Sequence, residues 1–293
     1  MTPPRASTEN ESPVAWITGA GGLIGHALVA CAVRMSLPWK VRPLTRADVD
    51  LTDWPGVTKL YREERPALIL HCAALSRTPV CEAHPELARL HNIEVTRHLV
   101  HLASDAYVIF FSTDLVFDGR KGHYREHEAV HPLSVYAETK VIAEEVVRQL
   151  PRHLILRTSL NLGRSPTGDR AFNEQLRRAW AAGHTTRLFV DEYRSPIAAD
   201  ETARLVWTLV LQQATGTLHL AGRDRLSRWD LGLLLASHWP DIDARMEPAS
   251  QKEFEGPPRP PDTSLDCSRA EGLLGQPMPS FRTWLGSQSP NTL

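Results

Sequence analysis

Three glycines follow an apolar run near the start of the chain, and this stretch constrains the fold more than any other. Residues 14–17 are typical of a buried strand, and Gly19, Gly22 and Gly25 follow at G-x-x-G-x-x-G spacing, ahead of apolar residues at helical spacing up to Arg34. In such a unit the first glycine allows the tight turn, the second lets the backbone approach a pyrophosphate, and the third lets the helix pack on the strand. The helix N-terminus adds free N–H groups and its dipole. The stretch predicts a dinucleotide-binding turn; the alternative is a turn with three incidental glycines.

Apolar runs alternate with helical segments through the first half of the chain. Strands and helices alternating at this length are typical of right-handed βαβ crossovers and a parallel sheet. After the first strand, the expected strands are residues 41–44 (interrupted by Pro43), 67–74, 107–111 and 153–156, and the expected helices include 85–104 and 134–150. We therefore predict an α/β fold with a Rossmann-type doubly wound parallel sheet.

The second half of the chain is less regular. The expected elements are helices over 172–182, 200–213 and 227–239 with Ser227 as N-cap, strands over 188–190 and 216–220, and a proline-rich surface loop over 256–261. We divide the chain into a disordered tail (1–13), an NAD(P)-binding Rossmann domain (14–160) and a segment (161–293) that is mainly a smaller α/β substrate lobe. The helix near 200–213 is expected to pack back on the sheet. The lobe should lie over the carboxyl ends of the strands, where ligands bind in such sheets.

The bulk composition excludes several classes of protein. The 293 residues carry a formal net charge of -1, which leaves no electrostatic footprint for nucleic-acid binding. No apolar run approaches the ~18 residues of a membrane span, and residues 1–13 lack the apolar segment of a signal peptide. The four cysteines show no C-x-x-C spacing, so no zinc site is expected. We expect reduced thiols and a cytoplasmic protein without a nucleic-acid or membrane partner.

Tyr136 and Lys140 are the strongest candidates for chemistry. They lie four residues apart on an expected helix and therefore share a face. A neighbouring ammonium favours the phenolate, so we expect Lys140 to lower the pKa of Tyr136 and make it a proton donor to a carbonyl oxygen. Thr113, at the end of an expected strand, can donate to the same oxygen. The alternatives are a solvated helical face for the pair and strand termination for Thr113.

Several histidines lie along the expected helix 85–104. His91, His98 and His101 share one face with Glu94, which is compatible with a metal site. An amphipathic helix needs a polar face whatever its function. We therefore favour a polar stripe and expect no metal.

The chain resembles the extended short-chain dehydrogenases/reductases of the dTDP-4-dehydrorhamnose reductase type. The resemblance covers nearly the whole chain except the N-terminal tail. The matching pieces run in the family's order: TGAGGLIG at 18–25, DLTD at 50–53, RPALILHCAA at 65–74, CEAHPELARLHN at 81–92, STDLVFDG at 112–119, PLSVYAETK at 132–140 with Glu144 beyond, LRTS at 156–159, DEYRSPI at 191–197 and RPPDTSLD at 259–266.

The resemblance implies a role for each matching residue. The family reduces a 4-keto sugar on a nucleoside diphosphate with NADPH or NADH. Proton donation would fall to Tyr136, its activation to Lys140, and orientation of the carbonyl to Thr113. The cofactor would contact Gly19, Gly22, Leu23, Ile24, Gly25, Asp50, Leu51, Ala73, Ala74, Ser112, Tyr136 and Lys140. The sugar nucleotide would contact Thr113, Asp114, Ser159 and Arg259.

Three positions depart from the family pattern. Leu115 stands where an aromatic residue often follows STD, Leu160 where a Trp often follows RTS, and Ile197 where a Thr often follows Pro. We expect all three on the substrate side, which predicts a related but different sugar, or none.

The preferred cofactor depends on the end of the second strand. A carboxylate there would bond the ribose 2′-OH of NADH and repel the 2′-phosphate of NADPH. The segment instead ends in Thr45 and Arg46, with no acid before Asp48. A guanidinium can hold a phosphate by two charge-assisted hydrogen bonds, and Thr45 could add a third. We predict that NADP(H) is preferred through Arg46, with NAD(H) as the alternative and a solvated Arg46 as the competing interpretation.

Two other functions stay open on the sequence. A sugar-nucleotide epimerase or dehydratase shares the expected fold, and Asp114 stands where a dehydratase would carry its acid. The regulatory beta subunit of methionine adenosyltransferase resembles the same family and binds NADP without needing turnover. The presence of Thr113, Tyr136 and Lys140 weakens the subunit alternative, whereas the epimerase or dehydratase stays open. We predict a nucleotide-sugar reductase, and a homodimer is also left open.

Overall fold

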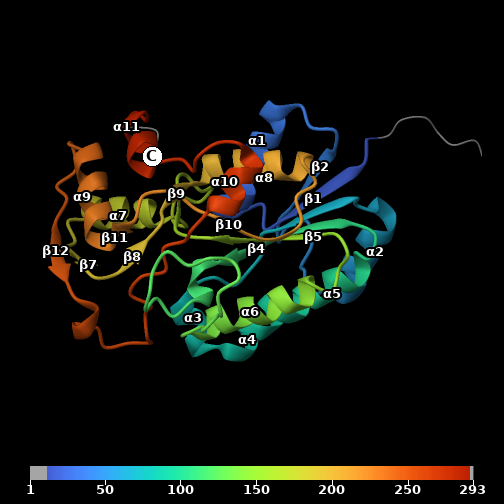
Figure 1. Cartoon of the computed structure of the whole chain (residues 1–293), viewed down its shortest axis with the longest axis horizontal. Coiled ribbons are helices and arrows are strands. Elements are labelled where there is room, and N and C mark those ends of the chain that lie inside the picture. Colours follow the sequence, from blue (N-terminus) through green and yellow to red (C-terminus); the bar gives the residue numbers. More distant parts are fainter. Residues whose placement is uncertain (1–11, 291–292) are drawn as a thin grey trace, which may run out of the picture.

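The computed structural model describes residues 12–290 and 293, so the tail expected over 1–13 lies almost wholly outside the described residues. Its centre is a six-stranded parallel sheet in the order β10-β5-β4-β3-β1-β2 (Figure 1). The sheet confirms the predicted Rossmann-type α/β fold. Its strands are β1 (Val14–Thr18), β2 (Lys40–Leu44), β3 (Leu68–His71), β4 (Tyr107–Thr113), β5 (His153–Thr158) and β10 (Gly216–Leu220).

Both faces of the sheet are buried at its centre, which explains the continuous apolar runs in β1, β3 and β4. Ile17 and Leu70 point to one face, and Trp16 and Ile69 to the other. Figure 1 shows α1, α8 and α10 above the sheet and α3 to α6 below it. The helices of this part are α1 (Leu23–Met35), α2 (Trp54–Glu64), α3 (Thr78–Ala83), α4 (Pro85–Arg89), α5 (Val95–Leu102), α6 (Val135–Val147), α8 (Ala199–Leu211) and α10 (Ser268–Leu274).

Strand β2 forms although a proline interrupts it. Pro43 has no N–H to donate, and a proline is tolerated in a strand at the edge of a sheet. Strand β2 lies at that edge, with β1 as its one neighbour.

The helix expected over 85–104 is interrupted by a π-helical turn. Leu90–Glu94 forms this turn between α4 and α5. Asn92 in the turn is buried, and its amide accepts from the backbone N–H of Leu75 (2.7 Å) and donates to the Leu75 carbonyl (3.0 Å) and to Thr139 Oγ1 (2.9 Å). The turn thus links the segment after β3 to helix α6.

Segments beyond residue 160 complete the sheet and its helical layer. Strand β10 pairs with β5, and α8 packs against α1, where Trp207 Nε1 donates to the carbonyl of Leu28 (3.0 Å). Residue 160 is therefore not a boundary of the sheet.

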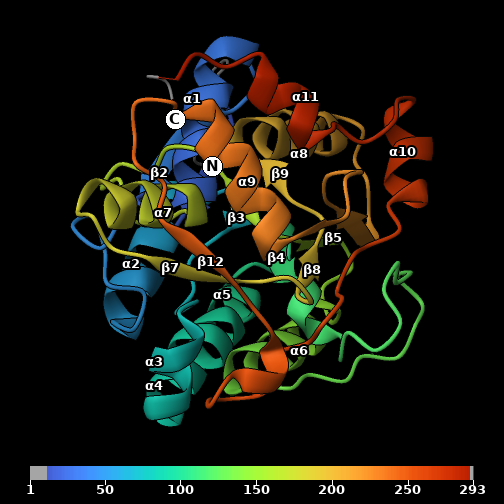
Figure 2. The ribbon, with the colours of Figure 1, turned by 90° about the vertical axis from the view of Figure 1, so that its left-hand side faces the viewer.

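The rest of the chain forms a smaller part with its own core around Trp180, Trp239 and Phe281. Figure 2 shows this part toward the viewer. Ser227 caps α9, as predicted, by accepting from Asp230 N (3.0 Å). The elements of this smaller part are β6 (Asn161–Leu162), β7 (Thr186–Phe189), β8 (Tyr193–Arg194), β9 (Ile197–Ala198), β11 (Leu226–Ser227), β12 (Met246–Ala249), α7 (Phe172–Ala181), α9 (Arg228–His238), α11 (Phe281–Gly286) and the 3-10 turn η3 (Gln251–Glu253). A second 3-10 turn, η2 (Asp114–Val116), directly follows β4 of the sheet. Among the described helices, none is long and apolar enough to cross a lipid bilayer.

Candidate active site

A cavity of about 1470 Å³ lies at the carboxyl ends of the sheet strands, between the sheet and the smaller part. Strand ends gather at one edge of a parallel sheet, so residues that are distant in sequence meet there. Every site residue predicted from the sequence lines this one cavity: Gly19, Gly22, Leu23, Ile24, Gly25, Arg46, Asp50, Leu51, Ala73, Ala74, Ser112, Thr113, Asp114, Tyr136, Lys140, Ser159 and Arg259.

The glycine turn forms one end of the cavity. Gly19 has φ +67°, and a Cβ there would lie 2.7 Å from the backbone nitrogen of Ala73, so a side chain has no room. Gly22 is the N-cap of α1, and neither a capping side chain nor an acidic residue occupies the first turn of that helix. The first N–H groups of α1 are therefore available to an anion, and the turn fits the pyrophosphate of a dinucleotide.

The loop after β2 leaves one cation at the cavity wall. Arg46 is exposed, lines the cavity, and takes part in no ion pair among the described residues. Asp48 accepts from Thr45 N (2.9 Å) and Thr45 Oγ1 (2.6 Å) and pairs with Arg42 (3.3 Å), and these contacts lower the pKa of Asp48. The hydroxyl of Thr45 is thus committed to Asp48, which corrects the expectation that it would add a bond to a 2′-phosphate.

Tyr136 and Lys140 lie on α6 at the middle of the cavity, but their electrostatics differ from the expectation. Lys140 is 2% exposed and its Nζ lies 3.9 Å from the centroid of the Phe110 ring. Burial lowers the pKa of Lys140 to about 7, against the opposing charge of Glu144. Burial, and then the charge of Asp114, raises the pKa of Tyr136. The prediction that Lys140 lowers the pKa of Tyr136 is therefore wrong for this structure. Burial destabilises the charged form of each group, so it favours the neutral amine of Lys140 and the protonated phenol of Tyr136.

A buried carboxylate fixes α6 against two strands. Glu144 accepts from Ser112 Oγ (2.5 Å), from Arg157 Nε (3.0 Å) and Nη2 (2.7 Å), and from Arg148 Nη2 (2.9 Å). Burial would raise the pKa of Glu144, but the bonds and charge of Arg157 lower it overall. Ser112, predicted to contact the cofactor, lines the cavity while its hydroxyl is bound to Glu144.

Asp114 is held by other residues of the cavity wall. It is 4% exposed, and its Oδ2 accepts from Ser159 Oγ (2.8 Å) and Thr263 Oγ1 (2.7 Å), with Arg194 Nε at 3.8 Å. Thr113 caps the turn after β4 by accepting from Leu115 N (3.2 Å). Asp114 and Ser159 thus line the cavity as a bonded pair rather than as free ligands.

The three departures from the family pattern do not share one environment. Leu115 and Leu160 line the cavity, as expected. Ile197 is 1% exposed within the core beneath α8, so the expectation that it faces the substrate is wrong.

Arginines line the far end of the cavity, and sequence reasoning assigned a role to one of them only. They are Arg170, Arg178, Arg187, Arg194, Arg228 and Arg259. Glu192, fully buried beside three of them, was also missed. Glu192 and Arg194 lie within the DEYRSPI piece, but nothing local in the sequence indicates what they contact.

The histidines of the 85–104 segment do not converge. His91 lines the cavity, whereas His98 packs on Trp54 (5.1 Å between centroids) and bonds to Thr58 Oγ1 (3.1 Å). Within residues 12–290 and 293, no three His, Cys, Asp or Glu side chains are placed to hold a metal ion.

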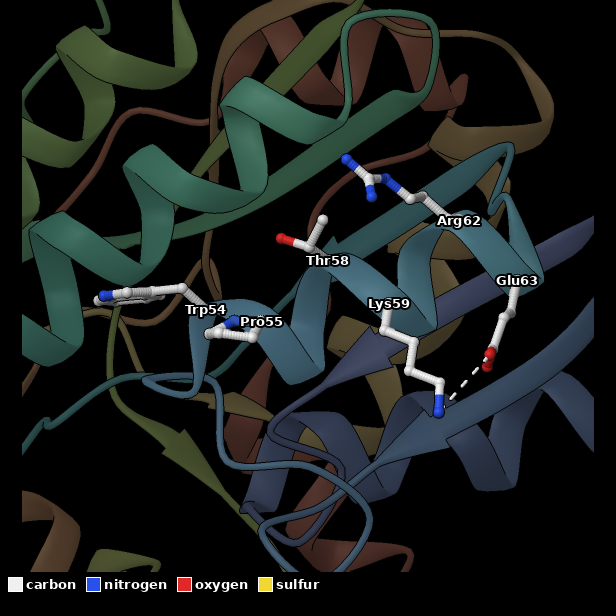
Figure 3. A pocket seen from close by; sticks show the side chains of 6 residues that line it. All are labelled: Trp54, Pro55, Thr58, Lys59, Arg62 and Glu63. Carbon is white, nitrogen blue, oxygen red and sulfur yellow. Dashed lines mark ion pairs between the residues drawn. The ribbon is translucent and has the colours of Figure 1, made fainter.

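A second hollow, of about 650 Å³, lies over α2 and contains none of the predicted site residues. Figure 3 shows its lining and the ion pair between Lys59 and Glu63 (4.0 Å). Its lining is Trp54, Pro55, Thr58, Lys59, Arg62 and Glu63.

The cavity therefore combines an anion-binding turn, a phenol and a threonine hydroxyl on its wall, and a cationic far end. These groups suit a reaction between a dinucleotide at the glycine turn and an anionic carbonyl compound near the arginines.

Comparisons with known proteins agree with this arrangement. The family described as RmlD substrate binding domain matches residues 15–289. The probable low-salt glycan biosynthesis reductase Agl14 of Haloferax volcanii is 31% identical over 91% of this chain and 94% of its own length. Methionine adenosyltransferase 2 subunit beta of Xenopus laevis is 28% identical over 90% of this chain and 84% of its own. The structure of dTDP-4-dehydrorhamnose reductase from Bacillus anthracis in complex with NADP shares the fold, with a TM-score of 0.85 at 24% identity over 94% and 98% of the two chains.

Proposed function

Because this chain belongs to the RmlD substrate binding domain family, we propose that it is an NADP(H)-dependent reductase of a nucleotide-linked 4-keto sugar, of the extended short-chain dehydrogenase/reductase class. The observation that carries the proposal is the meeting of Thr113, Tyr136 and Lys140 in one cavity, between the glycine turn and the arginines. A phenol in that place has a cofactor site on one side and an anionic substrate site on the other.

The cofactor site favours NADP(H) over NAD(H). Gly22 and the N-terminus of α1 would hold the pyrophosphate, and Arg46 would hold the 2′-phosphate. The carboxylate of Asp48, in the loop after β2, is bonded to Thr45 and paired with Arg42, and it forms no ion pair with Arg46. The structural neighbour from Bacillus anthracis holds NADP. When bound, the cofactor supplies the hydride.

Proton donation falls to Tyr136. Thr113 lines the same cavity as Tyr136, and both hydroxyls can bond the substrate carbonyl, although without substrate Thr113 Oγ1 donates to Asp114 Oδ1 (3.2 Å). The high pKa of Tyr136 keeps the phenol protonated at neutral pH, so it enters the reaction as an acid. Lys140 lies one turn further along α6, where its ammonium can bond ribose hydroxyls and stabilise the phenolate that proton transfer leaves.

Two other functions compete with this proposal. The relatives named methionine adenosyltransferase 2 subunit beta favour a cofactor-binding subunit without catalysis. A dehydratase is disfavoured by Asp114, whose carboxylate already accepts from Ser159 and Thr263. The presence of Thr113, Tyr136 and Lys140 together in the cavity supports an enzyme over the subunit function.

The test is NADPH oxidation by wild type and by Tyr136→Phe with dTDP- and UDP-linked 4-keto sugars. Removal of the phenol's proton should reduce kcat by about 10²–10⁴-fold, with NADPH affinity nearly unchanged. Equal turnover by the two proteins would reject Tyr136 as the acid. No turnover by wild type with any of these sugars would favour the subunit function.

A further inference from the structure

Glu192 is a buried carboxylate that three arginines from separate segments surround. It directly precedes β8; Arg194 lies in β8, Arg228 begins α9, and Arg259 lies in the proline-rich loop 256–261. Glu192 is 0% exposed and does not line the cavity, whereas all three arginines do. The carboxylate therefore lies behind the cavity wall that the arginines form.

The contacts of Glu192 are close and directional. Its Oε1 accepts from Arg228 Nε (2.7 Å) and Arg259 Nη2 (3.0 Å), with Arg194 Nη2 at 3.2 Å, and its Oε2 accepts from Arg259 Nε (2.6 Å). Burial would raise the pKa of Glu192, but the charges of Arg228, Arg194 and Arg259 hold it far below its usual range. The three guanidinium groups thus favour the ionised carboxylate, and three cations share its one charge.

The three arginines differ in how many guanidinium N–H donors remain without a hydrogen-bond partner. Arg194 is committed, because its Nη1 donates to the carbonyls of Tyr193 (2.7 Å) and Pro260 (3.0 Å). Arg228 donates through Nε alone, and Arg259 through Nε and Nη2. Across the described ranges 12–290 and 293, no bond uses the Nη atoms of Arg228 or Nη1 of Arg259.

We propose that Glu192 is a positioning residue. By accepting from the Nε atoms of Arg228 and Arg259, it orients the two side chains so that their remaining N–H groups face the cavity. These N–H groups then form a binding site for two linked phosphates. The inference rests on the proposed function, because it takes the diphosphate of a nucleotide-linked sugar as the ligand. An arginine held by a carboxylate has less side-chain freedom to lose on binding. Glu192 also balances part of the charge, which lets guanidinium groups stand side by side without a ligand.

Positioning and simple electrostatics predict opposite changes in anion affinity when the charge of Glu192 is removed. Removing a negative charge beside an anion site should strengthen anion binding through the field alone. If Glu192 acts by positioning, Glu192→Gln should instead weaken the binding of dTDP and inorganic pyrophosphate by ~10-fold or more, raise KM for the sugar nucleotide, and leave kcat and NADPH affinity nearly unchanged.

The experiment measures both probes by calorimetry and NADPH by fluorescence. Asp191→Asn is the control, since Asp191 accepts from Ser250 Oγ (2.6 Å) and Gln251 N (2.9 Å) and pairs with no arginine in the described part of the chain. The side chain of Asp191 is linked to that of Glu192 through Gln251, whose Nε2 donates to Glu192 Oε2 (3.3 Å). Arg228→Lys keeps the charge but removes the free Nη pair, and it should also lose ~10-fold if Glu192→Gln does not fold. Wild-type affinity for both probes in either folded variant, or no binding of either probe by wild type, overturns the inference.

These outcomes separate the inference from the proposed function. Binding of dTDP that depends on Glu192, without turnover of any keto sugar, would reject the reductase and keep the site. Turnover with an unchanged KM in Glu192→Gln would reject the site and keep the reductase.

Discussion

The two ends of the cavity bind through different parts of the polypeptide. At the glycine end, the backbone of Gly19 and Gly22 and the N-terminus of α1 provide neutral donors from one continuous stretch. At the far end, Arg228 and Arg259 provide guanidinium groups that Glu192 holds in place. Binding at the glycine end requires positions without side chains, whereas binding at the arginine end requires side chains from distant segments to come into contact. The first is therefore specified locally, and the second by long-range pairing of β8 with β11 and with Asp262, directly after the proline-rich loop.

Between the two ends, α6 carries the reactive groups and depends on a buried ion pair. Glu144→Gln should lower the free energy of unfolding by about 3–5 kcal/mol, because it leaves the buried Arg157 without its counter-charge. Urea unfolding measures this loss. Glu145→Gln is the control, since Glu145 is exposed, and it should cost less than about 1 kcal/mol. A loss below about 1 kcal/mol in Glu144→Gln would show that α6 is held by packing instead.

A negative charge placed at the glycine turn should greatly weaken cofactor binding. Gly22→Asp should weaken NADPH binding by roughly 100-fold or more, because the carboxylate would compete for the donors of α1 and repel the pyrophosphate. Gly22→Asn is the matched neutral control, and both residues are good N-caps, so the helix should persist. If fluorescence titration finds the two variants equally tight, repulsion of an anion at this turn is not what limits binding.

Discrimination between the cofactors should depend on one side chain. Arg46→Ala should remove a charge-assisted contact worth about 1.5–3 kcal/mol, so NADPH affinity should fall by roughly 10- to 100-fold and NADH affinity hardly at all. Arg62→Ala, which replaces an exposed arginine outside the cavity, should change neither. Equal losses for the two cofactors, or a wild type that favours NADH, would contradict the role of Arg46.

The smallest expected effect is the pH-dependent cost of burying Lys140. Below pH 7 both states of the protein carry the charged lysine, and burial penalises the folded state; between pH 7 and ~10.4 only the unfolded state binds the proton, so this group's contribution to stability rises with pH. Lys140→Met should therefore stabilise the protein without cofactor by about 1–2 kcal/mol at pH 6 and by less at pH 9. The exposed Lys59→Met should have no such pH dependence in the same urea unfolding experiments. A larger stability gain of Lys140→Met at pH 9 than at pH 6 would contradict a lowered pKa of Lys140 in the folded state.

The same contrast explains how much the sequence could predict. The glycine turn, the parallel sheet and the shared face of Tyr136 and Lys140 depend on residues that are close in sequence, and all were read from local patterns. The contacts of Glu192 with Arg228 and Arg259 span 36 and 67 residues. No periodicity indicates such a meeting, so Glu192 was missed although its motif was recognised.

Burial was the other quantity that local patterns did not provide. The sequence placed Lys140 beside Tyr136 but could not indicate that Lys140 is buried and Tyr136 partly buried, so the predicted direction of the pKa shift of Tyr136 was wrong. The core position of Ile197 was missed for the same reason. The π-helical turn at Leu90–Glu94 depends on the bonds of Asn92 to Leu75 and Thr139, which again join distant segments.

The central claim is that one cavity holds a hydride source at the glycine end and a carbonyl compound at the arginine end, with Tyr136 between them. Transfer of deuterium from NADPH labelled at C4 of the nicotinamide tests this claim most directly. Wild type incubated with a dTDP-4-keto-6-deoxy sugar should give a reduced sugar nucleotide that carries one deuterium at C4, and Tyr136→Phe should form it ~100-fold more slowly or worse. A product without deuterium, or a wild type that binds both compounds and transfers nothing, would contradict the account.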